Sequence, residues 1–186
     1  MDITEAVEIL KNGGVMVFAT DTVWGVGAAI ESKKGIEKLY RIKNREKNKP
    51  TAVLVGSMSQ AYKYGDFNDV AKELAIKYWP GALTVVVPAK KGVNGKILNS
   101  NGGVGIRWAD TKIVGNLCRG LGGGIVATSA NLTGEKPPTN LAEVSTDLLD
   151  RVDGVIEMGG GGRKSSTVVD LMGENIKILR QGDVWV

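Results

Sequence analysis

Two hydrophobic patterns alternate along this chain. In one, apolar residues recur three or four positions apart, as in Ala6, Ile9 and Leu10, which is the spacing of one face of a helix. In the other, short runs are apolar almost throughout, as in Val15 to Ala19, which is typical of a buried strand. Repeated alternation of the two patterns predicts an α/β protein.

Residues that favour helix ends accompany the helical stretches. Asp2, Ser32, Asn68 and Asp110 each stand directly before one, where their side chains can accept from free backbone N–H groups. Glycine or a Pro-Gly pair ends others. We therefore predict helices from residue 3 to Gly13-Gly14, over 33–42, 69–79 and 111–121, and from about 141 to 149.

The apolar runs predict the strands. They cover 15–19, 51–55, 83–87, 104–107, 125–128, 155–157, 167–170 and 177–179. The last two are close enough in sequence to pair as a hairpin. Helices between the early strands and a hairpin at the end predict one mixed, twisted open sheet with helices on its faces. We expect a single domain covering residues 1–186.

Composition is that of a soluble globular protein, with 42% hydrophobic and 24% charged residues, so disorder is not indicated. No apolar run approaches the length of a membrane helix, and the first residues lack the order of a signal peptide. We therefore expect a cytoplasmic protein without a membrane partner.

The chain contains no histidine and one cysteine. Ser-His-Asp and Cys-His mechanisms are therefore excluded, and so is a disulfide framework. Cys118 lies between Leu117 and Leu121 on a predicted helix, so we interpret it as an unreactive core thiol. What remains is chemistry by positioning, cations and backbone amides, which is typical of phosphoryl and nucleotidyl transfer.

Positive charge is concentrated in one segment. The net charge is +4, and residues 41–49 alone contain five cations against Glu46. A local patch of this kind fits a small anion or an RNA backbone, and a solvated loop explains it equally well.

Small polar residues follow several predicted strands. Thr20 to Gly25 follows the first, Ser129-Ala130-Asn131 follows the strand 125–128, and Arg107 ends another. Each alone is also explained by a turn or an ion pair, and Asp21 fits either a metal ligand or an Asx turn. Together they predict an anion-handling site.

A glycine run from 159 to 162 precedes Arg163, Lys164 and Ser165. It lacks the Gly directly before Lys-Ser and precedes a strand, so we reject a Walker A site. Two interpretations are equally good: the bare amides bind an anion together with Arg163, Lys164 and Ser166, or the segment is a mobile surface loop.

Seven motifs appear in a fixed order. They are Thr20 to Gly25, Lys43-Asn44-Arg45 with Lys49-Pro50, Trp79 to Thr84, Gly105 to Arg107, Ser129 to Asn131, Ser166 to Asp170, and Arg180 to Gly182. In this order they resemble the YrdC/TsaC family of threonylcarbamoyl-AMP synthases over nearly the whole chain. The chain resembles the short form of that family, which has no extra C-terminal domain.

The resemblance implies a reaction of L-threonine, bicarbonate or CO2, and ATP that yields threonylcarbamoyl-AMP and pyrophosphate. The product serves the synthesis of N6-threonylcarbamoyladenosine in tRNA, which would be a partner directly or through downstream proteins. Mg2+ would arrive with ATP, and no organic cofactor or protein-held metal is implied. The implied fold is a twisted open α/β sheet with a concave, positively charged cavity.

Site residues follow from the same motifs. Thr22, Arg107, Ser129 and Ser166 would bind threonine, with Arg107 offering its carboxylate a bidentate contact. Lys43 and Arg45 would be catalytic and face the phosphates. The residues that would bind ATP are Arg45, Lys49, Asn131, Thr139 and Arg180.

The sequence departs from the family pattern at three places. Trp24 stands where the family usually has Tyr, and Ala82 where Pro is frequent. Trp108-Ala109 stands where a Pro commonly follows the arginine by two positions. Trp24 lacks the Tyr hydroxyl and adds bulk, so it bears on amino-acid preference. Two alternatives stand beside the synthase: an RNA-binding module without chemistry, and a sister transferase that uses another carbamoyl donor. The basic segment contains no aromatic residue for base stacking, which disfavours the first.

Overall fold

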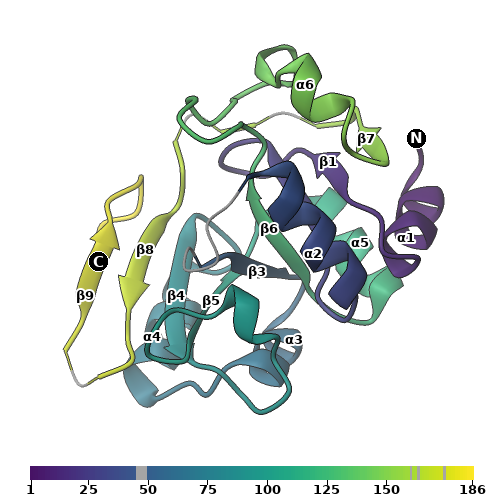
Figure 1. The fold of residues 1–186 in the computed structure, drawn as a ribbon. Helices are drawn as coiled ribbons and strands as arrows, with labels where there is room; N and C mark the ends of the chain where they lie inside the picture. Colours follow the sequence, from purple (N-terminus) through teal and green to yellow (C-terminus); the bar gives the residue numbers. More distant parts are fainter. Residues whose placement is uncertain (45–49, 160, 163, 174) are drawn as a thin grey trace.

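A nine-stranded mixed sheet runs through the molecule in the order β7-β1-β2-β6-β3-β5-β4-β8-β9 (Figure 1). The computed structural model describes residues 1–44, 50–159, 161–162, 164–173 and 175–186, and the sheet is that of these residues. The strands are β1 (Met16–Phe18), β2 (Gly25–Ala29), β3 (Ala52–Val55), β4 (Leu83–Pro88), β5 (Gly103–Trp108), β6 (Ile125–Ser129), β7 (Gly154–Ile156), β8 (Thr167–Asp170) and β9 (Lys177–Arg180).

Parallel and antiparallel pairs occur in the same sheet. β3 pairs with β5, and β4 with β8, in the parallel direction, whereas β2 and β3 both run antiparallel to β6. β8 and β9 form an antiparallel hairpin with an irregularity between Val168 and Val169. The mixed sheet and the terminal hairpin predicted from sequence are thus confirmed.

Helices begin at capping side chains in most cases. Asp2, Ser32 and Asn68 each accept a hydrogen bond from the backbone three residues ahead, as predicted. Within the described ranges no helix is long and apolar enough to cross a membrane. The α-helices are α1 (Ile3–Lys11), α2 (Lys33–Ile42), α3 (Met58–Tyr64), α4 (Asp69–Tyr78), α5 (Lys112–Leu121) and α6 (Thr146–Leu149), with 3-10 turns η1 (Gly95–Ile97) and η2 (Leu141–Glu143).

Two helix predictions were wrong in detail. Thr111, not Asp110, caps α5, because Thr111 has an extended backbone and its hydroxyl accepts from the Ile113 N–H at 3.2 Å. The helix predicted over 141–149 divides into η2 and α6. Val144 between them is extended and only 4% exposed, so its burial in the core interrupts the helix.

Sequence reasoning missed β2 and α3. β2 reads Gly-Val-Gly-Ala-Ala, in which Val26 alone is of the β-branched or aromatic kind typical of strands. Gly27 is required there because a Cβ at this position would come within 2.8 Å of both Ile125 Cγ2 and the Val126 carbonyl oxygen. The small residues of β2 therefore serve the close pairing with β6.

The two faces of the central sheet differ in what they contact. Val53, Val85, Ile106 and Val126 are fully buried. A Cβ on Gly65, at the end of α3, would come within 2.8 Å of Ile106 Cδ1, so this is the face that the helices cover. α3, α4 and α5 pack against β3, β4 and β5. The alternate positions of these strands face the other way, and that face bears the candidate site.

Candidate functional site

A cavity of about 270 Å³ lies on the open face of the sheet. Every second residue of the strands contributes to its floor, because successive side chains of a strand point to opposite faces of the sheet. The apolar part of the wall includes the side chains of Leu54, Val86 and Val168. The polar positions of the same strands and of the loops at their ends supply the chemistry: Thr20, Thr22, Thr84, Arg107, Ser129, Ser166 and Arg180.

All four residues predicted to bind threonine line this cavity: Thr22, Arg107, Ser129 and Ser166. Of those predicted to bind ATP, Arg180 lines it as well. Thr139 lines a second cavity of about 760 Å³ that shares Val23, Pro137 and Ser165 with the first. Arg45 and Lys49 lie outside the described residues, so their predicted roles stay predictions.

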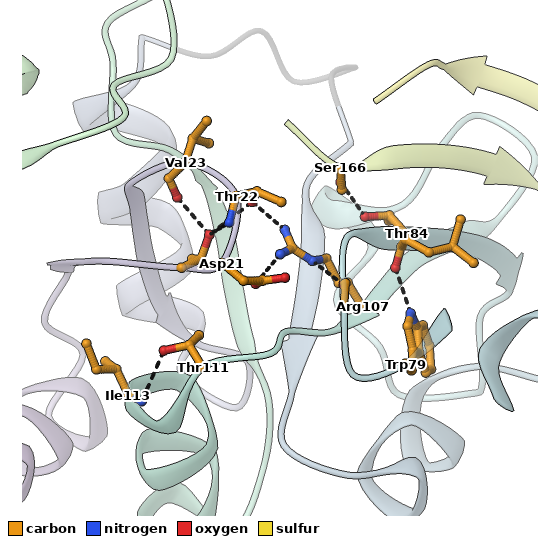
Figure 2. Close-up of polar contacts among 12 residues, drawn as sticks. Asp21, Thr22, Val23, Trp79, Thr84, Arg107, Thr111, Ile113 and Ser166 are labelled. Atoms are coloured by element: carbon orange, nitrogen blue, oxygen red, sulfur yellow. Dashed lines mark hydrogen bonds and ion pairs between the residues drawn. The ribbon is translucent and has the colours of Figure 1, made fainter. Parts of the chain in front are cut away.

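Arg107, at the end of β5, is anchored on three sides (Figure 2). Its Nε donates to the Gly81 carbonyl oxygen at 3.0 Å and its Nη1 to Thr22 Oγ1 at 2.7 Å. Its Nη2 forms an ion pair and hydrogen bond with Asp21. Since a guanidinium has five N–H donors, two remain for a ligand. Asp21 thus has a role beyond a turn: it provides the counter-charge of this arginine.

Its neighbours leave the hydroxyl of Thr22 one acceptor lone pair for a ligand. Thr20 Oγ1 donates its one hydrogen to the Val23 carbonyl oxygen at 2.7 Å, so Thr22 must be the donor in the 3.0 Å bond between the two threonine hydroxyls. Thr22 also accepts from Arg107, which leaves one lone pair. Toward a ligand, Thr22 can therefore only accept a hydrogen bond.

Arg180 and Ser166 form a second network in the cavity wall. Arg180 Nε donates to the Ser166 carbonyl oxygen at 2.9 Å, and Nη2 to Ser166 Oγ at 3.0 Å. Ser166 Oγ lies 2.8 Å from Thr84 Oγ1, as Figure 2 shows. Thr84 was not among the predicted site residues.

The electrostatics of the cavity favour an anion. Burial lowers the pKa of Arg107, Asp21 opposes that effect, and the charge of Arg180 adds to the lowering. The two guanidiniums are thus close enough to repel each other, and Asp21 is the acidic partner that the described residues give Arg107. An added carboxylate or phosphate would relieve the repulsion between the two arginines.

Lys43 is buried, with 3% of its surface exposed. Its ammonium donates to the backbone carbonyl oxygen of Ser129 at 2.8 Å and to that of Asn131. Thr133 in turn donates to the Lys43 carbonyl oxygen at 3.0 Å. The structure therefore joins the lysine to the Ser-Ala-Asn segment, beside the cavity rather than in its lining.

Asn131 and Thr139 are held by local hydrogen bonds. The Asn131 amide donates to the carbonyl oxygens of Leu132 and Glu135, and its buried Oδ1 has no partner among the described residues. Thr139 donates its hydroxyl hydrogen to the Glu143 carboxylate, which also accepts from the Thr139 N–H at 2.7 Å. Thr139 thus keeps acceptor capacity toward the second cavity, whereas Asn131 lines neither of the two cavities and its predicted contact with ATP stays a prediction.

The glycines at 161 and 162 pack directly onto the site. A Cβ at Gly162 would lie 2.2 Å from the Asp21 carbonyl oxygen, and one at Gly161 would lie 2.3 Å from the Thr139 carbonyl oxygen. Gly161 also borders Trp24, which is 2% exposed and whose indole N–H has no partner among the described residues. Residues 160 and 163 of the predicted anion-binding loop lie outside the described residues.

Among the described residues, no group of three acidic or cysteine side chains is placed to hold a metal ion. Asp21, which the sequence left open as a metal ligand or a turn residue, is paired with Arg107.

This fold and cavity define a mixed α/β domain with an arginine-lined ligand site. The model of the Sua5/YciO/YrdC family, described as telomere recombination, matches residues 8–182. The chain belongs to this family, as its motifs predicted.

Curated relatives and solved structures agree. The chain is 34% identical over 176 residues to a putative threonylcarbamoyl-AMP synthase of Methanocaldococcus jannaschii, covering 94% of this chain and 82% of the relative. It is 30% identical to the threonylcarbamoyl-AMP synthase of Photobacterium profundum, over 97% and 99% of the two chains.

A crystal structure of P. abyssi Sua5 complexed with L-threonine superposes with a TM-score of 0.89 at 28% identity. The match covers 97% of this chain but 54% of that one, so the chain spans about half the length of P. abyssi Sua5.

Proposed function

We propose that this chain is a threonylcarbamoyl-AMP synthase, a nucleotidyltransferase that converts L-threonine, bicarbonate or CO2, and ATP into threonylcarbamoyl-AMP and pyrophosphate. Its relatives carry this name, and one related structure binds L-threonine. The observation that carries the proposal is the Arg107 guanidinium, anchored beside Thr22 in a cavity that also contains Arg180 and Ser166.

Threonine fits the smaller cavity. A volume of about 270 Å³ is near the lower end of ligand pockets, which run from about 300 to 1,000 Å³, and suits an amino acid better than a nucleotide. The two remaining donors of Arg107 would bind the carboxylate, and the open lone pair of Thr22 would accept from the amine.

ATP would extend from Arg180 into the second cavity, where Thr139 lies. Lys136 and Lys164 line that cavity together with Glu135 and Glu143, so its charges balance, and the two lysines would be the side chains that face the phosphates. Lys43 would hold the Ser-Ala-Asn segment in place beside the first cavity, and Asn131 would reach the nucleotide only if its buried Oδ1 becomes accessible on binding. Mg2+ would arrive bound mainly to phosphate oxygens, as is usual for this ion.

The proposed reaction has two bond-forming steps. The neutral amine nitrogen of threonine forms a C–N bond with CO2 and loses one proton to water, which gives a carbamate. A carbamate oxygen then attacks the α-phosphorus of ATP, the bond from that phosphorus to the bridging oxygen breaks, and pyrophosphate leaves. The role of the cations is to neutralise the phosphates and align the reactants. The product would pass to tRNA modification, directly or through other proteins.

Pyrophosphate release by the purified protein tests this function. Release should require ATP, L-threonine and bicarbonate together, and L-serine should support less of it. Arg107→Lys keeps the charge but loses the planar fork, so it should raise the KM for threonine more than the KM for ATP.

Three results would redirect the proposal. Pyrophosphate release at the same rate with and without L-threonine would contradict the proposed function. Release only with another carbamoyl donor would indicate the sister transferase. Salt-sensitive RNA binding without any release would indicate a binding module.

A further inference from the structure

Thr84 occupies a rigid position on the floor of the cavity. It lies in β4, between Leu83 and Val85, which are both fully buried, and it pairs in register with Val168 of β8. Its own exposure is 4%, and its β-branched side chain has few alternative rotamers in a strand. Thr84 is therefore fixed by the centre of the sheet.

Arg180 is in the opposite situation. It ends β9, an edge strand whose four residues are all exposed, next to an irregularity in the β8–β9 pairing. A long side chain at such a place pays entropy for any fixed geometry. Among the described residues its anchors are the carbonyl and hydroxyl oxygens of Ser166, at 2.9 and 3.0 Å.

We propose that Thr84 is a positioning residue of the site: its hydroxyl orients the Ser166 hydroxyl and, through it, the guanidinium of Arg180. This inference rests on the proposed function for its kinetic consequences. The geometry behind it is a chain of two hydrogen bonds, 2.8 Å from Thr84 to Ser166 and 3.0 Å from Arg180 to Ser166, that links the centre of the sheet to its edge.

The hydroxyls of Thr84 and Ser166 together also have one hydrogen that is not used in a hydrogen bond among the described residues. Ser166 Oγ accepts from Arg180, and the bond between the two hydroxyls uses only one of their two hydrogens. The described residues provide no further partner for the other hydrogen, and both residues line the cavity. The pair can therefore donate to an oxygen of the substrate, whereas Thr22 can only accept.

Substitution of Thr84 by valine keeps the shape and removes the hydroxyl. We expect Thr84→Val to raise the KM for threonine about tenfold, the equivalent of one lost hydrogen bond of somewhat above average strength. The KM for ATP should rise by a smaller factor through Arg180. The kcat should stay within about threefold, because the loss affects ground state and transition state alike. Thr84→Ser retains a hydroxyl and should restore both KM values.

Tyr64→Phe is the matched control. Tyr64 is also buried, its hydroxyl also makes a 2.8 Å bond, which it accepts from the Gly124 N–H, and it lines neither cavity. A purely structural role for Thr84 would lower the Tm of both variants similarly and leave both KM values unchanged. The inference requires a KM effect in Thr84→Val that Tyr64→Phe does not show.

A second measurement does not depend on activity. The Arg180 Nη2–H that donates to Ser166 Oγ should exchange slowly with water in an NMR spectrum of the wild-type protein and faster in Thr84→Val. The signal is assigned by its loss in Arg180→Lys. Unchanged exchange, or equal impairment of Thr84→Ser and Thr84→Val, would overturn the inference. If the wild type releases no pyrophosphate, the proposed function fails and the exchange rate still decides the role of Thr84.

Discussion

The ammonium of Lys43 lies 2.8 Å from the carbonyl oxygen of Ser129, although 86 residues separate them in sequence. A buried cation thus fixes the backbone of the segment that lines the cavity, and two motifs that look independent in the sequence form one unit.

Substitution of Lys43 by methionine should damage both stability and activity. Two backbone carbonyl oxygens would lose a charged donor, so we expect the free energy of unfolding to fall by about 1–3 kcal/mol. Urea denaturation measures this. Lys63→Met is the control, because Lys63 also donates to a carbonyl oxygen, that of Gly122, but is exposed, and its loss should cost less than about 0.5 kcal/mol. Equal effects of both substitutions would refute a special role for Lys43.

Asp21→Asn should leave the Arg107 guanidinium without its counter-charge. Breaking a buried ion pair from one side costs about 3 kcal/mol, so the Tm without ligand should drop clearly. L-Threonine would then supply the missing carboxylate, so it should raise the Tm of the variant more than that of the wild type. The control is the exposed residue Asp66, changed to Asn. A variant that threonine stabilises no more than the wild type would speak against the carboxylate site.

The Asp153 carboxylate should make stability depend on acid pH. Burial raises its pKa, but hydrogen bonds from Lys38 and the Val15 N–H more than offset this, so the pKa lies below its ordinary value of 3.8. A lowered pKa stabilises the fold above the ordinary value, and this contribution is lost as the pH falls through the lower one.

Asp153→Asn should therefore be less stable than the wild type by about 1 kcal/mol near neutral pH. The difference should shrink as the pH falls below about 4. Urea denaturation across this range measures it, and Lys38→Met should reproduce the trend. A difference that is the same at every pH would show that the carboxylate charge contributes nothing.

Cys118 should be unreactive in the folded protein. It is fully buried, burial raises its pKa to about 12, and its Sγ contacts the Leu54 carbonyl oxygen at 3.6 Å. Because the thiolate is the reactive form, a disulfide reagent should modify the chain only after unfolding in concentrated urea. Rapid modification under native conditions would mean that the helix carrying Cys118 opens easily.

Much of the secondary structure follows from local signals. The caps Asp2, Ser32 and Asn68 begin their helices as expected, because each satisfies N–H groups of its own first turn. The errors occur where distant residues decide. Val144 breaks a predicted helix because the core takes its side chain, and β2 forms from weak strand residues because β6 lies beside it.

The four residues that the family resemblance predicts to bind threonine all line one cavity, because they stand at or near the ends of strands of one sheet. Thr84 was not among the predicted residues, because it stands inside the apolar run from Leu83 to Val87, where sequence alone does not tell which alternate positions face the cavity. The order of the strands and the helices that cover one face of the sheet decide which positions of β4 face the cavity.

By itself, then, the sequence determined the alternation of helices and strands, the absence of histidine chemistry, the family, and five of the polar residues that line the first cavity. Only the tertiary structure decided that Asp21 pairs with Arg107, that Lys43 binds backbone carbonyls, and that Thr84 joins Ser166. The reason is physical: capping and periodicity depend on neighbours within a few residues, whereas these bonds join residues that are 82 or more positions apart and exist only once the sheet has assembled.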